Sequence, residues 1–145
     1  MSKRDDLGEE LYSMIAQLLN SKMNRTVLDS IRGEYGVLRY LLFVEDGVKA
    51  GTLTEKMQVV PGRMTDILKS LEYKGLVVRR KEETDKRIVR VFLTEAGRQE
   101  AEEKRHQIHL EYRGLIERLG EKDATEFIRL LKIVLEYPNS MDSFE

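Results

Sequence analysis

Apolar residues recur at helical spacing near both ends of the 145-residue chain. In the N-terminal segment this spacing predicts a helix over about residues 6–23, with one apolar stripe. The polar run at residues 24–26 predicts a bend, and residues 34–45 follow as a short, mostly buried helix. A last helix over about residues 122–137 is apolar almost all round, and Pro138 is expected to end it.

The middle of the chain predicts two shorter helices separated by a turn. Thr52 and Glu55 have the spacing of a capping box, which predicts the start of the first one. Pro61 suits the first position of the second helix, which spans about residues 61–74. Gly75 is expected to end that helix in the left-handed conformation.

After this second helix the hydrophobic period changes from helical to extended. Residues 76–81 and 88–93 are strand candidates rich in β-branched residues, and the polar residues 82–87 form a hairpin tip between them. Thr94 is a suitable N-cap for a long helix that runs to about Leu119. The order predicts a mainly α protein with a small β-wing (α+β), in which a helix-turn-helix precedes the wing.

Charge is distributed unevenly, although the formal net charge is only -1. Residues 49–98 hold 12 basic and 7 acidic side chains, a net of +5, which leaves a net of -6 for the remainder. A basic middle between acidic ends indicates a segment that binds a polyanion.

Composition excludes several classes of function. The chain has no cysteine, which excludes disulfides, thiolate metal sites and cysteine nucleophiles. Neither a Ser/His/Asp arrangement, a Gly-rich phosphate loop nor an HExxH motif is present, so we expect neither an enzyme nor a cofactor. With no signal peptide and no apolar run long enough to span a membrane, we expect a soluble, cytoplasmic protein with no membrane partner.

Three segments around the hairpin carry a family resemblance. They are DKR at residues 85–87, VFLTEAG at residues 91–97, and LEYKGLV at residues 71–77. Together they resemble the wing signature of MarR-family winged-helix transcriptional regulators. The resemblance implies a homodimer, usually a repressor bound to a double-stranded DNA operator, which in many members is released by a small molecule.

The resemblance also implies a division of the chain. Residues 1–31 and 100–138 are expected to form a helical dimerisation region, and residues 32–99 a winged helix-turn-helix DNA-binding lobe. Residues 139–145 are expected to form a flexible tail. The apolar last helix cannot be covered within a chain of this size, which independently predicts a partner subunit. The dimerisation residues that we predict are Leu11, Ile15, Leu18, Leu115, Leu119, Leu130 and Val134.

The helix over residues 61–74 is the expected reader of the major groove. Its outward face carries Arg63, Thr65, Asp66, Lys69, Ser70 and Tyr73. Arg63 lies in the first turn, and a bidentate contact from arginine to guanine is the commonest specific pairing. Gly62 lets the backbone approach a phosphate, and Thr65 and Lys69 are phosphate or base candidates.

The wing supplies the remaining candidates. Arg87, at its tip, is the expected minor-groove residue, because narrow grooves attract arginine. We expect Asp85 to orient Arg87 through an ion pair. Lys86, Arg80 and Arg90 are candidates for phosphate contacts.

Some residues depart from the family pattern. Asp66 stands where many relatives carry a basic residue, and it could accept a hydrogen bond from a cytosine amino group. Val60 replaces the usual Ser or Thr cap before the recognition helix. Gly33 and Gly36 each cost about 0.5–1 kcal/mol against Ala in a helix, and the sequence leaves their role open.

Two other hypotheses stay open at this point. Glu102, His106 and His109 fall on one helix face, so a metal-dependent regulator that uses the two histidines is an alternative, although a closed zinc site needs about four ligands. A winged-helix protein-interaction adaptor that does not bind DNA is another. For a small-molecule effector, the candidate pocket residues are Tyr12, Tyr35 and Arg39.

Overall fold

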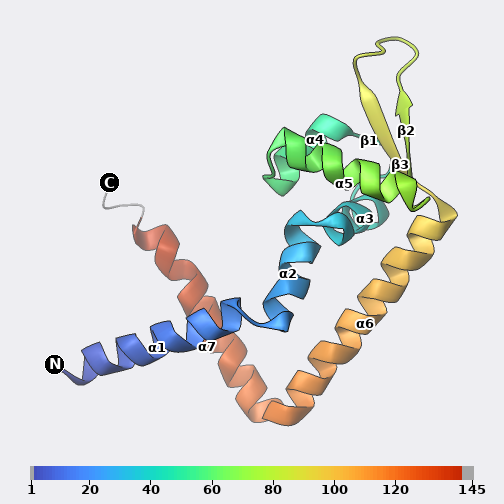
Figure 1. Ribbon diagram of the computed structural model, residues 1–145. Helices are drawn as coiled ribbons and strands as arrows, with labels where there is room; N and C mark the ends of the chain where they lie inside the picture. The colour runs from blue at the N-terminus through green and yellow to red at the C-terminus, as the bar shows by residue number, and fades with distance from the viewer. Residues whose placement is uncertain (1, 142–145) are drawn as a thin grey trace. The chain divides into compact units, whose positions relative to one another are not determined.

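A computed structural model describes residues 2–141 of the chain, which divides into two compact units between residues 103 and 104. The helices and strands of the first unit are α1 (Lys3–Leu19), α2 (Lys22–Arg32), α3 (Glu34–Phe43), β1 (Val48–Lys49), α4 (Ala50–Met57), α5 (Pro61–Tyr73), β2 (Val77–Lys81), β3 (Val89–Leu93) and the start of α6 (Glu95–Leu119) (Figure 1). The second unit holds the remainder of α6 and α7 (Glu121–Met141). The predicted fold class, mainly α with a small β-wing, is confirmed.

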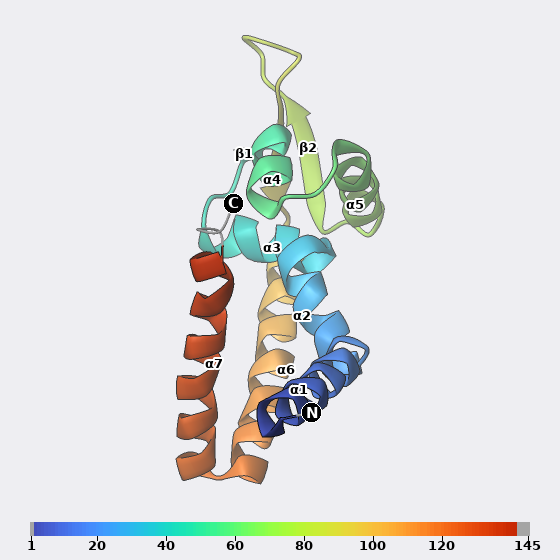
Figure 2. The same ribbon diagram turned by 90° about the vertical axis from the view of Figure 1, so that its left-hand side faces the viewer.

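Three short antiparallel strands form the sheet, in the order β1-β3-β2. Val91 in the middle strand lies opposite Arg79 of β2 on one side and Val48 of β1 on the other. The β2–β3 hairpin projects beyond α4 and α5, as Figure 2 shows, so the predicted wing is present. Strand β1 was not predicted, because two residues carry no period.

The core of the first unit lies between α3, α4, α5 and the sheet. The inner face of α5 supplies four apolar side chains that are each at most 4% exposed: Met64, Ile67, Leu68 and Leu71. The other elements contribute Val37, Leu38, Leu41, Val48, Leu53, Met57, Val77, Val91 and Ala101. This burial holds α5 in place while its opposite face stays in solvent.

The bounds of α5 confirm the sequence prediction. Pro61 is its first residue, where the missing N–H costs no helical hydrogen bond. Beyond its end, Gly75 has a φ of 74°, in the left-handed region that favours glycine. Thr94 likewise caps α6, since its hydroxyl accepts a hydrogen bond from the Gly97 N–H at 2.9 Å.

The predicted bend at residues 24–26 is wrong, because the break lies at residues 20–21. The Ser21 hydroxyl caps α2 by accepting from the Asn24 N–H at 3.3 Å. The Asn24 side-chain amide in turn donates to the Leu19 carbonyl at 2.6 Å, across the break. The polar residues therefore stabilise the start of the second helix instead of interrupting one.

The predicted start of the short middle helix is also wrong. Helix α4 begins at Ala50, its N-cap is Lys49, and Thr52 already lies within it. Residues three apart are neighbours inside a helix as well as at its start, so the Thr52–Glu55 spacing does not distinguish the two positions.

Two glycines allow α2 and α3 to approach closely. Gly33 is both the C-cap of α2 and the N-cap of α3, and a Cβ there would collide with the Asp29 side chain and lie 2.9 Å from the Asp29 Cα. A Cβ on Gly36 would lie 2.9 Å from the Met57 Cε and 3.1 Å from the Ser30 carbonyl oxygen. Close packing is therefore the role of both glycines, which the sequence left open.

In the second unit, α6 ends at Leu119. Gly120 follows with a φ of 83°, in the left-handed region that favours glycine at the end of a helix. Helix α7 continues to Met141, so the prediction that Pro138 ends it is wrong. A proline removes one helical N–H but need not stop the backbone from continuing beyond it. The expected tail at 139–145 therefore begins inside α7, and residues 142–145 lie outside the described residues. Within the described residues, every helix is too short or too polar to cross a membrane.

Candidate nucleic-acid interface

The outward face of α5 presents the predicted recognition residues together. Gly62, Arg63, Thr65, Asp66 and Lys69 are all exposed, on the side opposite the buried apolar stripe. The Thr65 hydroxyl donates to the Pro61 carbonyl at 3.0 Å, which leaves its oxygen lone pairs toward solvent.

The start of α5 is open to an approaching group. No described side chain caps it, and Val60 precedes Pro61 in extended conformation. Gly62 has an ordinary negative φ, and a Cβ on it would meet nothing within 4 Å. Neither backbone strain nor packing requires glycine here, so its effect is to leave the first-turn N–H groups accessible, where a helix favours an anion.

A polar anchor ties α5 to α3. The Glu34 carboxylate accepts a hydrogen bond from the Ser70 hydroxyl at 2.7 Å and forms an ion pair with the Lys74 ammonium at 3.1 Å. Partial burial raises the pKa of Glu34, but the Ser70 and Lys74 hydrogen bonds and the charges of Lys74 and Arg63 outweigh it and lower that pKa below its usual value. Ser70 therefore faces α3 and does not lie on the outward face, where the sequence placed it.

At the wing tip, the predicted ion pair between Asp85 and Arg87 is present. The Arg87 Nε and Nη2 donate to the two carboxylate oxygens at 3.1 and 3.2 Å, and its backbone N–H donates to Asp85 Oδ1 at 3.1 Å. These hydrogen bonds lower the pKa of Asp85, and the charge of Lys49 adds to the effect. The Arg87 side chain is nevertheless 92% exposed, so its guanidinium is oriented and still available to DNA.

The other basic wing residues differ in their surroundings. Arg80 is exposed and lies over the Phe92 ring, 5.5 Å from its centroid. Lys86 is exposed at the tip. Arg90 is half-buried, donates to Glu82, and donates to the Gly47 carbonyl at 3.0 Å, so its guanidinium joins the strands of the sheet.

A groove at the base of the wing was missed by the sequence analysis. Its lining comes from the start of α4 and from the hairpin: Lys49, Ala50, Gly51, Thr52, Glu55, Arg87, Ile88 and Val89. Because the sequence placed the start of this helix at Thr52, Lys49 lay outside the predicted elements and received no role. The excess of basic residues over 49–98 was the available signal.

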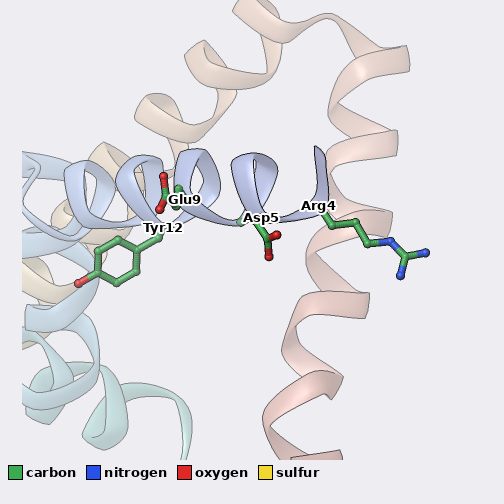
Figure 3. Close-up of a pocket in the computed structure, with 5 residues that line it drawn as sticks. Arg4, Asp5, Glu9 and Tyr12 are labelled. Atoms are coloured by element: carbon green, nitrogen blue, oxygen red, sulfur yellow. The ribbon is translucent and has the colours of Figure 1, made fainter. Parts of the chain in front are cut away.

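The three predicted effector residues differ in exposure and lie on two different helices. Tyr12 is 78% exposed on α1, Tyr35 is buried on α3, and Arg39 is exposed on α3. Tyr12 borders a shallow, open hollow along α1 whose other lining residues, Arg4, Asp5, Gly8 and Glu9, come from the same helix (Figure 3). An open hollow on one helix does not enclose a ligand, so the effector pocket stays a prediction.

His106 and His109 are both exposed on α6. Among the described residues, no group of three or more His, Cys, Asp or Glu side chains is placed to hold a metal ion. Nothing in this part of the chain favours the metal-dependent alternative.

The predicted dimerisation residues lie at the surface of the single chain. Leu11, Ile15 and Leu18 are exposed on α1, as are Leu130 and Val134 on α7. On α6, Leu115 is half-buried and Leu119 is exposed.

A buried helix-turn-helix with an exposed polar face, followed by a projecting hairpin, defines a winged-helix protein. Residues 34–89 match the MarR family. The chain is 30% identical over 105 residues to the uncharacterized HTH-type transcriptional regulator YdgJ of Bacillus subtilis, an alignment that covers 72% of this chain and 62% of that relative. The chain is therefore similar to the MarR family, whose members are transcriptional regulators, over its winged-helix segment, and it spans about three fifths of the length of this relative.

Solved structures share this fold at lower identity. The PcaV transcriptional regulator of Streptomyces coelicolor has a TM-score of 0.72 and 18% identity, over 88% of this chain and 97% of that one. Streptococcus pneumoniae FabT, solved in complex with DNA, has a TM-score of 0.66 and 19% identity, over 96% of this chain and 99% of that one.

Proposed function

We propose that the chain is a homodimeric, sequence-specific double-stranded DNA-binding regulator that acts in the cytoplasm as a repressor, with operator binding modulated by a small molecule. The observation that carries DNA binding is the contrast between the two faces of α5. One face is buried in the core, and the other presents Arg63, Thr65, Asp66 and Lys69 to solvent. A helix held in this way fits a major groove.

Each exposed side chain has a role in this proposal. Arg63 reads a guanine, Asp66 accepts from a cytosine amino group, and Thr65 and Lys69 contact phosphate or base. The open start of α5 at Gly62 receives a backbone phosphate.

In the wing, Arg87 enters the minor groove, held at the correct angle by Asp85. Lys86 and Arg80 contact the adjacent phosphates. Arg90 supports the wing from within, because Glu82 and Gly47 already engage its guanidinium.

The exposed apolar side chains of α1 and α7 support the homodimer. On α7 the eight large apolar side chains from Phe127 to Tyr137 are 43–65% exposed. Monomeric proteins rarely expose a contiguous apolar surface of this kind. A second copy of the chain would cover it in a two-fold symmetric dimer. Repression follows from occupation of the operator by the dimer, and effector modulation is proposed from the similarity to the MarR family.

Selection of bound duplexes from a random DNA pool, at about physiological salt, tests the proposal. We expect a two-fold symmetric motif whose half-sites lie about one helical turn apart, roughly 34 Å. Binding should weaken steeply with added salt, because phosphate contacts release counterions. A folded dimer that retains no duplex at any salt would instead favour the adaptor hypothesis.

A further inference from the structure

One flank of α5 carries three polar side chains in a line. Arg63, Ser70 and Lys74 follow one another at intervals of seven and four residues, and residues at these intervals lie on the same side of a helix. The line follows the border of the buried face, because Ser70 is half-buried whereas Arg63 and Lys74 are exposed. The predicted base reader, Arg63, therefore shares a flank with the two residues that contact α3.

The Glu34 carboxylate, at the start of α3, lies beside this flank. One of its oxygens accepts from the Ser70 hydroxyl at 2.7 Å, and both accept from the Lys74 ammonium at 3.1 Å. Partial burial alone would raise the pKa of Glu34, but these hydrogen bonds and the charges of Lys74 and Arg63 lower it. The carboxylate is therefore ionised at neutral pH and offsets part of the positive charge on this flank.

The ion pair of Lys74 with Glu34 is open to solvent. The Lys74 side chain is 53% exposed and that of Glu34 is 34% exposed. A pair with this exposure contributes little to stability. On the opposite side, the Arg79 guanidinium that pairs with Glu72 is 29% exposed and belongs to β2. Lys74 is thus the paired cation on α5 itself that an approaching phosphate can reach.

We propose that Glu34 determines specificity, by withholding Lys74 and Arg63 from the phosphates of non-cognate DNA. This inference rests on the proposed DNA-binding function. Non-cognate DNA is held almost entirely through its phosphates, so a carboxylate that neutralises one cation and repels phosphate weakens this binding most. On the operator, Arg63 contacts a guanine edge, and the carboxylate on its flank keeps the guanidinium away from the backbone.

Glu34→Gln tests the proposal, with Ser70→Ala as the matched control. The substituted amide at position 34 still offers an oxygen to the Ser70 hydroxyl but carries no charge. Ser70→Ala removes the same hydrogen bond and keeps the carboxylate. Affinity is measured by fluorescence anisotropy on the selected operator duplex and on a scrambled duplex of equal length, over a series of salt concentrations. Circular dichroism checks that each variant keeps its helices.

We expect Glu34→Gln to bind the scrambled duplex roughly three- to tenfold more tightly, the effect of removing one partly screened charge beside the backbone. The operator should gain about twofold or less, since the guanine contact loses its orienting charge. The ratio of the two affinities therefore falls. On the scrambled duplex, the slope of log affinity against log salt should grow in magnitude by about 0.9, for one added phosphate contact. Ser70→Ala should leave the slope and the scrambled-duplex affinity unchanged.

A second pair of variants assigns the added contact to Lys74. In the wild-type background, Lys74→Ala should leave the salt slope unchanged, because Glu34 already engages the ammonium. Combined with Glu34→Gln, it should return the slope to the wild-type value. Lys74 then matters to DNA only when the carboxylate is neutral, which a purely structural role of the anchor does not predict.

Three outcomes would overturn the inference. Weaker or unchanged binding of Glu34→Gln to the scrambled duplex would reduce Glu34 to a structural anchor of α5. Equal gains on the operator and the scrambled duplex would show that its charge sets overall affinity and not specificity. An enlarged slope that persists in the double variant would place the added contact on another cation. If wild-type protein binds neither duplex, the proposed function itself fails, which the wild-type titration shows separately.

Discussion

Helices α5 and α7 are both rich in apolar residues, yet the single chain buries only one of them. The four apolar residues on the inner face of α5 are at most 4% exposed, whereas the large apolar residues of α7 are 43–65% exposed. The apolar face of α5 is buried by its own chain, so its polar face is available to another molecule. The apolar residues of α7 stay exposed on the described chain, and in the homodimer that we propose this surface contacts protein instead of DNA.

The largest expected effect comes from placing charge on α7. Leu130→Asp combined with Val134→Asp should cost at least about 4 kcal/mol of association free energy and yield a monomer, because two carboxylates would be buried in an apolar interface. Sedimentation velocity measures the result. Lys122→Asp, at the exposed start of α7, is the control and should stay dimeric. A double variant with the dissociation constant of the wild type would place the interface elsewhere.

The corresponding change on α5 should affect folding instead of association. Leu71 is 1% exposed, so Leu71→Ala should lower the free energy of unfolding by about 2–5 kcal/mol through the cavity it leaves. Urea unfolding monitored by circular dichroism measures this. Tyr73→Ala, at a position 94% exposed on the same helix, should change that free energy by less than about 0.5 kcal/mol. Equal losses for the two variants would refute the division of α5 into a buried and a free face.

A smaller effect is expected on the polar face of α5. Arg63→Ala should cost about 1–3 kcal/mol of binding free energy on the selected operator and relax the preference at one base position. Titration against operators with each base at that position measures both quantities, and circular dichroism checks that the fold is kept. An equal loss on scrambled DNA would mean that Arg63 contacts phosphate and reads no base.

The smallest effect concerns the anchor of α5 to α3. The folded-state pKa of Glu34 is lowered, so its stabilising contribution is present above the ordinary carboxyl pKa and is lost as pH falls through the lower, folded value. Glu34→Gln should therefore flatten the dependence of the unfolding free energy on pH in the acid range. At neutral pH the same substitution should lower that free energy by less than about 1 kcal/mol. Glu45→Gln, at an exposed residue just after α3, is the control. Parallel curves for wild type and Glu34→Gln would remove the anchor from the account of stability.

The sequence predicted α5 and the wing well because their signals are local. Pro61 and Gly75 mark the ends of α5, a helical period marks its buried face, and β-branched residues mark β3. The Asp85–Arg87 ion pair was predicted for the same reason, since its partners are only two positions apart in the sequence.

The sequence missed contacts between distant segments. Glu34 and Lys74 are 40 residues apart, and Gly47 and Arg90 are 43 apart, so neither spacing carries a signal. Arg90 was for that reason expected at the surface. The misplaced start of α4 has another cause, because capping residues and helix-interior residues obey the same three-residue spacing.

The junction at Gly33 gives the fold a mechanical property. Gly33 is both the C-cap of α2 and the N-cap of α3, so no loop separates the two helices. The next residue, Glu34, is bonded to Ser70 and Lys74 at the far end of α5. We therefore expect a rotation of α2 to move α5 as well, because one shared residue and one hydrogen-bonded carboxylate connect the two helices without an intervening loop.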